Sequence, residues 1–88
     1  GVYLLDEPEV PLSPQNQIAF LAMLKEMVGQ NSQFLIATHS PIITAFPGAT
    51  ILNCDETGLQ PIAYEDFDHV RLTKQFLNNP EQFLRHLF

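Results

Sequence analysis

A run of four apolar residues at positions 2–5, closed by Asp6, Glu7 and Pro8, restricts the possible folds of this chain more than any other segment. Continuous apolar runs of this length are typical of strands that are buried on both faces of a parallel sheet. Pro8 also keeps Glu7 out of the α-helical conformation. Because open α/β sheets bind their ligands at the carboxyl ends of such strands, the run predicts a buried strand with two carboxylates at its functional end.

A second apolar run at residues 33–38 is joined to the first by a segment with helical signals. Ser13 and Pro14 are residue types that favour an N-cap and the first helical position. Gly29 is expected to stop the helix, which predicts a helix over residues 14–28. Strand–helix–strand units of this length are almost always parallel and right-handed. We therefore expect both strands to be parallel, with their carboxyl ends at one edge of a sheet.

The middle of the chain predicts a short helix and a β-hairpin. Ser40 precedes another proline, which is the pattern of an N-cap, and the helix that it opens must end before Pro47. Residues 50–54 and 60–64 are expected to form two strands around a turn rich in turn-forming residue types. Cys54 would then be buried in the first of these strands.

The C-terminal part has the pattern of two helices. Asp66 or Asp68 can cap a helix that runs to about residue 77, and Asn79 can cap a final one, with Gln82 placed for a capping box. The predicted class is thus α/β, with parallel strands joined by a crossover helix, then a β-hairpin and C-terminal helices. An apolar strand that follows Gly1 directly indicates a piece of a longer chain.

Composition limits the partners that this segment can have. The 88 residues carry a net charge of −6, which disfavours direct contact with nucleic acid, because basic residues supply most of that affinity. The chain contains no apolar run as long as the roughly 18 residues of a membrane span. The single cysteine, Cys54, excludes an internal disulfide and fits a cytoplasmic location.

Three residues at the predicted strand ends carry the chemistry. Asp6 and Glu7 are adjacent on an extended chain, so their side chains point to opposite faces and cannot share one task. One carboxylate can bind Mg²⁺, which prefers oxygen ligands, and the other can accept a proton from an attacking water. His39 follows the second strand and is expected at the same sheet edge as Glu7.

These segments together resemble the C-terminal half of ABC-type ATPase domains, more closely the SMC-like and uncharacterised bacterial predicted ATPases than the transporter subunits. Residues 4–8 are similar to the Walker B motif, residues 9–14 to the D-loop and residues 37–40 to the switch-histidine loop. The tail at residues 71–87 is similar to the end of the predicted-ATPase group, so the resemblance covers essentially all 88 residues.

The resemblance implies a fold, cofactors and residue roles. Residues 1–88 would be the C-terminal portion of a single RecA-like P-loop NTPase domain of the ABC type, whose cofactors are ATP and Mg²⁺. Asp6 would bind Mg²⁺ through water, Glu7 would be the general base and His39 the γ-phosphate sensor. Ser13 would contact the cofactor from the D-loop at the interface of a homodimer that sandwiches two ATP molecules. Transporter-type D-loops usually have an aspartate where Ser13 stands.

Two departures and two alternatives accompany this interpretation. The chain has neither the Gly-x-x-x-x-Gly-Lys-Ser/Thr loop that cradles phosphates nor a Ser-Gly-Gly-Gln signature, so the segment alone is expected to be inactive. One alternative is a Toprim-like Mg²⁺-dependent nuclease or phosphotransferase, for which Asp66 and Asp68 have the Asp-x-Asp spacing. The other is a non-catalytic interaction module with an ATPase-derived fold. Transport, DNA repair and defence all remain open as the process that ATP turnover drives.

Overall fold

The computed structural model describes residues 1–88, and the chain divides into two compact units. Unit 1 is Gly1–Ala49 and unit 2 is Thr50–Phe88. Unit 1 contains Asp6, Glu7, Ser13 and His39, so its fold decides how these residues meet.

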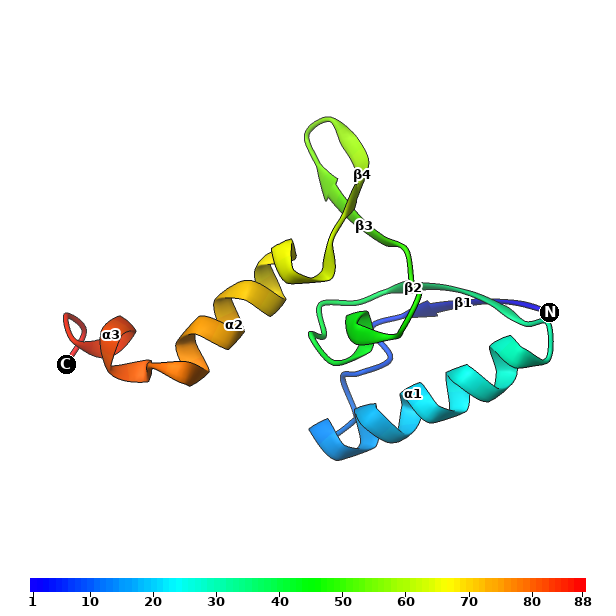
Figure 1. Ribbon diagram of the computed structural model, residues 1–88, viewed down its shortest axis with the longest axis horizontal. Helices are drawn as coiled ribbons and strands as arrows, with labels where there is room; N and C mark the ends of the chain where they lie inside the picture. Colours follow the sequence, from blue (N-terminus) through cyan, green and yellow to red (C-terminus); the bar gives the residue numbers. More distant parts are fainter. The chain divides into compact units, whose positions relative to one another are not determined.

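Unit 1 is a strand–helix–strand unit followed by a single short turn of helix (Figure 1). Its elements are β1 (Val2–Asp6), α1 (Pro14–Gly29), β2 (Gln33–Ala37) and the 3₁₀ helix η1 (Ile43–Ala45). β1 and β2 pair in parallel, with Leu4 opposite Leu35 and Asp6 opposite Ala37. The predicted parallel pairing across a helix is therefore confirmed, and both strands end at the same edge.

The N-terminus of α1 agrees with the sequence signals, whereas its C-terminus differs from them. At the N-terminus, the Oγ of Ser13 accepts a hydrogen bond from the backbone N–H of Asn16 at 3.1 Å, and Pro14 is the first helical residue. At the C-terminus, Gly29 was expected to stop the helix but is its last residue. The left-handed backbone that reverses the chain is found at Asn31, with φ 66°. Asparagine tolerates this conformation better than most residues, so it replaces the expected glycine.

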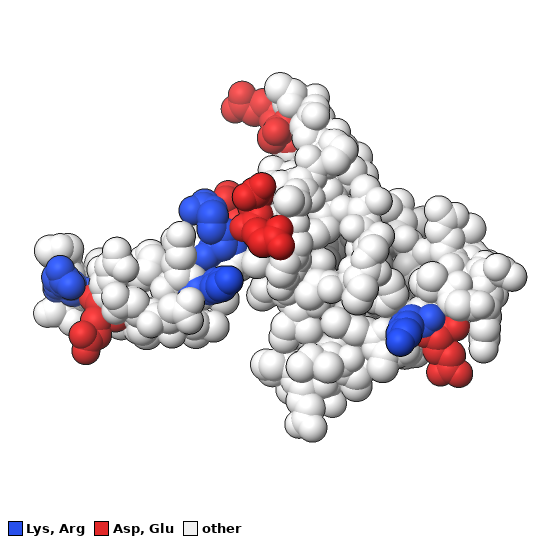
Figure 2. Space-filling model, in the orientation of Figure 1, with Lys and Arg blue, Asp and Glu red and all other residues white.

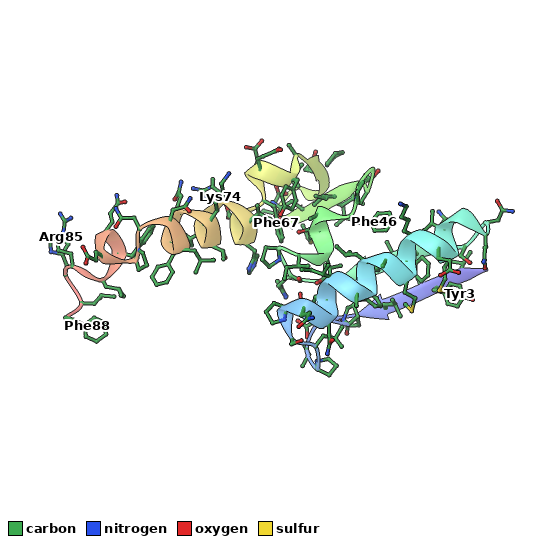
Figure 3. All side chains as sticks on the ribbon, turned by 60° about the horizontal axis from the view of Figure 1, so that its bottom comes forward. Tyr3, Phe46, Phe67, Lys74, Arg85 and Phe88 are labelled. Carbon is green, nitrogen blue, oxygen red and sulfur yellow. The ribbon has the colours of Figure 1, made fainter.

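The two faces of the β1–β2 pair differ in burial. On one face, the rings of Tyr3 and Phe34 stack with their centroids 5.0 Å apart, and Leu5 and Ile36 are half-buried (Figure 3 labels Tyr3). Because α1 is the long helix of this unit and lies along the strands in both ribbon views, we assign this face to α1 (Figures 1 and 3). The apolar residues of the opposite face are mostly exposed: Val2, Leu4, Leu35. The prediction of a strand buried on both faces is thus wrong for this chain, which covers only one face.

The buried core of unit 1 is small. Its buried apolar residues are Leu24 on α1 and Ile43 on η1, and the one buried polar residue is Ser40, which lies between β2 and η1. No helix in the chain is both long and apolar enough to cross a membrane.

Unit 2 begins with the expected hairpin, whose second strand starts earlier than predicted. β3 (Ile51–Asp55) and β4 (Gly58–Ile62) are antiparallel, with Asp55 opposite Gly58, so the loop contains two residues. Gly58 has φ 106°, a conformation that a residue with a Cβ rarely adopts, so glycine suits this strand start. Cys54 is exposed on β3, so its predicted burial is wrong.

The helical tail of unit 2 consists of η2 (Tyr64–Asp66), α2 (Asp68–Asn78) and α3 (Pro80–Leu84). The expected aspartate cap is wrong: Phe67 occupies the N-cap of α2 and makes no side-chain capping bond. Asp68 instead lies in the first turn, where its Oδ1 accepts from Arg71 at 2.8 Å and its charge favours the helix N-terminus. Asn79 caps α3 as predicted, since its Oδ1 accepts from the N–H of Gln82 at 3.4 Å.

Basic residues are distributed unevenly between the two units (Figure 2). Three of the four basic residues, Arg71, Lys74 and Arg85, belong to the helical tail of unit 2, where Figure 3 labels the last two. Lys25 on α1 is the one basic residue of unit 1. The segment at the end of β1 contains Asp6, Glu7 and Glu9 and no Lys or Arg, so it is acidic.

Candidate functional site

The carboxyl ends of β1 and β2 bring together two of the residues that the sequence singled out. Nδ1 of His39 lies 3.1 Å from Oε1 of Glu7. Both side chains are well exposed, at 66% for His39 and 47% for Glu7. Because an ionised carboxylate can only accept, this contact requires the proton on Nδ1. The prediction that Glu7 and His39 share one sheet edge is confirmed, and the pair lies open to a ligand.

The backbone of Glu7 has an unusual conformation. Its φ is 47°, in the left-handed region that non-glycine residues enter at a cost of about 1–2 kcal/mol. Pro8 was expected to hold Glu7 away from the right-handed helix, and the result is a sharp turn and not an extended strand. The N–H of Glu7 donates to the carbonyl of Ala37 at 2.7 Å, which extends the ladder between the strands by one bond. Such strained residues cluster at functional sites.

Glu9 belongs to this site, although the sequence did not single it out. Its Oε1 accepts from the hydroxyl of Thr38 at 2.6 Å, and its Oε2 accepts from the backbone N–H of His39 at 3.1 Å. One half-buried carboxylate thus ties the segment after β1 to the segment after β2. No local pattern could have revealed this contact, because it joins residues about 30 positions apart.

Ser40 connects the same segment to α1. Its Oγ accepts from the N–H groups of Ile42 and Ile43, at 3.1 and 3.0 Å, and donates to Oε1 of Gln17 at 2.5 Å. The side chain is 4% exposed, so these partners satisfy a buried hydroxyl. The prediction that Ser40 is the N-cap is wrong, because Ile42 occupies the N-cap of η1, which is a single 3₁₀ turn and not an α-helix. Ser40 Oγ nevertheless accepts from the two backbone N–H groups at the start of this turn.

Asp6 and Ser13 differ in whether their side chains make hydrogen bonds. Asp6 is the last residue of β1, and its exposed carboxylate makes no side-chain hydrogen bond. An uncommitted carboxylate at a strand end fits a Mg²⁺ ligand, although the chain has no cluster of three or more metal-binding side chains. Any Mg²⁺ here would need water or phosphate oxygens as its other ligands. Ser13 is exposed and uses its Oγ to cap α1.

The environment of Glu9 lowers its pKa below the ordinary value of 4.5. Partial burial alone would raise the pKa. The hydrogen bond from Thr38, the backbone N–H groups of Glu9 and His39, and the nearby His39 ring together outweigh that burial effect. The ionised form of Glu9 is therefore the one that fits the folded site.

The depressed pKa of Glu9 predicts an acid-dependent loss of stability. Its folded pKa lies below its unfolded pKa, so the stabilisation is fully present above about pH 4.5 and is lost as the pH falls through the folded value. We expect Glu9→Gln to lower the free energy of unfolding by about 1–2 kcal/mol at pH 6. The difference from wild type should shrink towards pH 3. Urea unfolding of the chain at both pH values measures this, with Glu26→Gln on the surface of α1 as the control. A difference that stays constant with pH would contradict it.

Comparisons with known proteins relate the chain to ATPases. Residues 1–44, half of the chain, match the family described as AAA ATPase domain. The chain is also 34% identical, over 89 aligned residues, to an uncharacterized ABC transporter ATP-binding protein of Haemophilus influenzae. This alignment covers 96% of the chain but 33% of the relative, so the chain spans about a third of that protein's length. The matched residues 1–44 contain Glu7, Glu9 and His39, and the chain belongs to the AAA ATPase domain family.

Proposed function

We propose that this chain forms the C-terminal portion of an ABC-type ATPase domain with a RecA-like P-loop core. In the longer protein, which we call the full-length protein, the domain binds ATP with Mg²⁺ and hydrolyses it in the cytoplasm. The observation that carries the proposal is the contact between Glu7 and His39 at the paired ends of β1 and β2. Membership of an ATPase family supports the same reaction class.

Each residue has a separate task in this proposal. Glu7, at the sharp turn after β1, accepts a proton from the attacking water, since its carboxylate is exposed. His39 contacts the γ-phosphate and is oriented by its bond to Glu7. Asp6 would bind Mg²⁺ through water, and this ion neutralises charge on the β- and γ-phosphates when bound. Catalysis of this kind depends mainly on positioning and electrostatics.

The proposed site needs groups that this chain does not supply. Lys25 is the one basic residue of unit 1, and the residues at the strand ends are acidic. The chain also lacks a phosphate-cradling loop, whose backbone N–H groups hold phosphates in P-loop proteins. We therefore assign the phosphate-binding groups to another part of the full-length protein. Ser13 would reach the nucleotide from the D-loop at a homodimer interface.

The test compares the full-length protein with the isolated chain. We expect Mg²⁺-dependent ATP hydrolysis by the full-length protein. The 88-residue chain should show no turnover and bind ATP-Mg no better than about millimolar, because its negative charge repels the ligand. Phosphate release and isothermal titration calorimetry measure the two properties. Absence of hydrolysis in the full-length protein would overturn the proposal, and micromolar binding by the chain would show that the nucleotide site is misplaced.

The nuclease alternative finds no support from the residues that it requires. Asp66 ends η2 and Asp68 begins α2, so neither lies at the carboxyl end of a parallel strand. The carboxylate of Asp68 is already paired with Arg71. The ATPase function is therefore the one that the described side chains support best.

A further inference from the structure

The proposed reaction uses Asp6, Glu7 and His39 but leaves Glu9 without a task. Glu9 is nevertheless the residue of unit 1 whose carboxylate has both oxygens bonded within the protein. Its partners, Thr38 and the N–H of His39, belong to the segment that carries the proposed γ-phosphate contact. We call these two bonds the Glu9 clamp.

We propose that Glu9 is a positioning residue that sets the geometry of the Glu7–His39 pair, an inference that rests on the proposed ATPase function. Glu9 lies two residues after Glu7 and grips the backbone of His39 directly. It thereby holds the two strand-end segments at a fixed separation. These bonds would fix the position of the general base, Glu7, relative to the γ-phosphate contact, His39.

Two further bonds join the same two segments. The N–H of Glu7 donates to the carbonyl of Ala37, and the Glu7 side chain contacts the His39 ring. The Glu9 clamp adds a bond to the backbone of His39, whose side chain is 66% exposed. Thr38 also accepts from the N–H of Ser40 at 3.0 Å, so the clamp extends into the buried serine and, through it, to α1.

The clamp depends on the length and the two oxygens of a glutamate side chain. Aspartate keeps the charge but is shorter by one methylene, so it cannot reach both Thr38 and His39 from the same backbone position. Glutamine keeps the length, can still accept from the His39 N–H, and can donate from its amide to the Thr38 hydroxyl. A geometric role therefore predicts that glutamine rescues function better than aspartate, whereas a purely electrostatic role predicts the reverse.

The first test is steady-state ATP hydrolysis by variants of the full-length protein. We expect Glu9→Ala and Glu9→Asp to lower kcat by about 10–100-fold, the range expected for misplaced catalytic groups. The KM for ATP should change little, because in the proposed site Glu9 does not contact the nucleotide. Glu9→Gln should retain most of the wild-type kcat. The matched control is Glu26→Ala, which removes a carboxylate from the exposed surface of α1.

Substitutions of Thr38, whose hydroxyl donates to Glu9, provide a second test of the clamp. Thr38→Val removes the hydroxyl and should lower kcat to a similar degree, while Thr38→Ser keeps the hydroxyl and should remain active. In the Glu9→Ala background, Thr38→Val should add less than it does alone, since the Thr38–Glu9 bond is already lost and only the bond from the N–H of Ser40 remains to be removed. Full additivity of the two substitutions would overturn the inference.

Amide hydrogen exchange provides a readout that does not depend on hydrolysis. Glu9→Ala should increase exchange at the His39 N–H, which the clamp protects, while Glu26→Ala should not. Unchanged exchange would overturn the clamp. Faster exchange with normal kcat would overturn its positioning role and leave the ATPase proposal standing. If the wild-type full-length protein does not hydrolyse ATP, the ATPase proposal fails, and the positioning role fails with it.

Discussion

Replacing Glu7 with glutamine in the full-length protein should reduce ATP hydrolysis by about 10²–10⁴-fold while ATP-Mg still binds. The amide has nearly the same shape as the carboxylate, so the turn after β1 and the bond to Ala37 should survive. What is lost is the anionic oxygen that accepts the proton of the attacking water. Because ATP then binds without turnover, a nucleotide-dependent dimer should accumulate.

Single-turnover hydrolysis and sedimentation with ATP-Mg measure these two effects. Glu26→Gln, which makes the same chemical change on the exposed surface of α1, is the control. Turnover near the wild-type rate in Glu7→Gln would identify Glu7 as an ordinary strand-end acid. In that case, the chain would be better explained as part of a non-catalytic interaction module.

Replacing Asp6 with asparagine should act on binding and not only on turnover. Asp6 has the exposed, uncommitted carboxylate at the end of β1. We expect affinity for ATP in the presence of Mg²⁺ to fall by about 10–100-fold, the range seen when groups around a bound metal are lost. Without Mg²⁺, the variant should bind ATP no more weakly than wild type, because the substitution also removes a negative charge.

Calorimetry with and without Mg²⁺ separates these two contributions. Glu7→Gln serves as the comparison, since it should keep the Mg²⁺-dependent affinity that Asp6→Asn loses. An equal loss of affinity in the presence and absence of Mg²⁺ would argue against Asp6 as the Mg²⁺ residue. It would point instead to a general disturbance of the end of β1.

Short-range patterns accounted for most of the elements in unit 1. The apolar runs, the Ser13 cap and the length of the connection were sufficient to predict two parallel strands joined by α1. They also placed Glu7 and His39 at one edge, because parallel strands end on the same side of a sheet. These signals are local, or follow from chain topology, and so can be recognised in a single sequence.

The patterns were less informative where burial or precise backbone geometry was involved. Val2 and Leu4 were expected to be buried but are exposed, because an apolar run shows what can be buried and not what covers it. Cys54 was misjudged for the same reason. The cap of α2 was also assigned to an aspartate, although Phe67 occupies that position without a side-chain bond.

The contacts that organise the candidate site could be found only in three dimensions. Glu9 follows the proline of a recognisable motif, but its bonds to Thr38 and His39 cross the strand pairing and leave no periodic signal. The left-handed backbone of Glu7 and its bond to Ala37 in the neighbouring strand are likewise visible only in three dimensions. Residue types and spacing thus indicated which groups reach the sheet edge. Their mutual distances arise from hydrogen bonds between segments about 30 residues apart, which form only once the strands have paired.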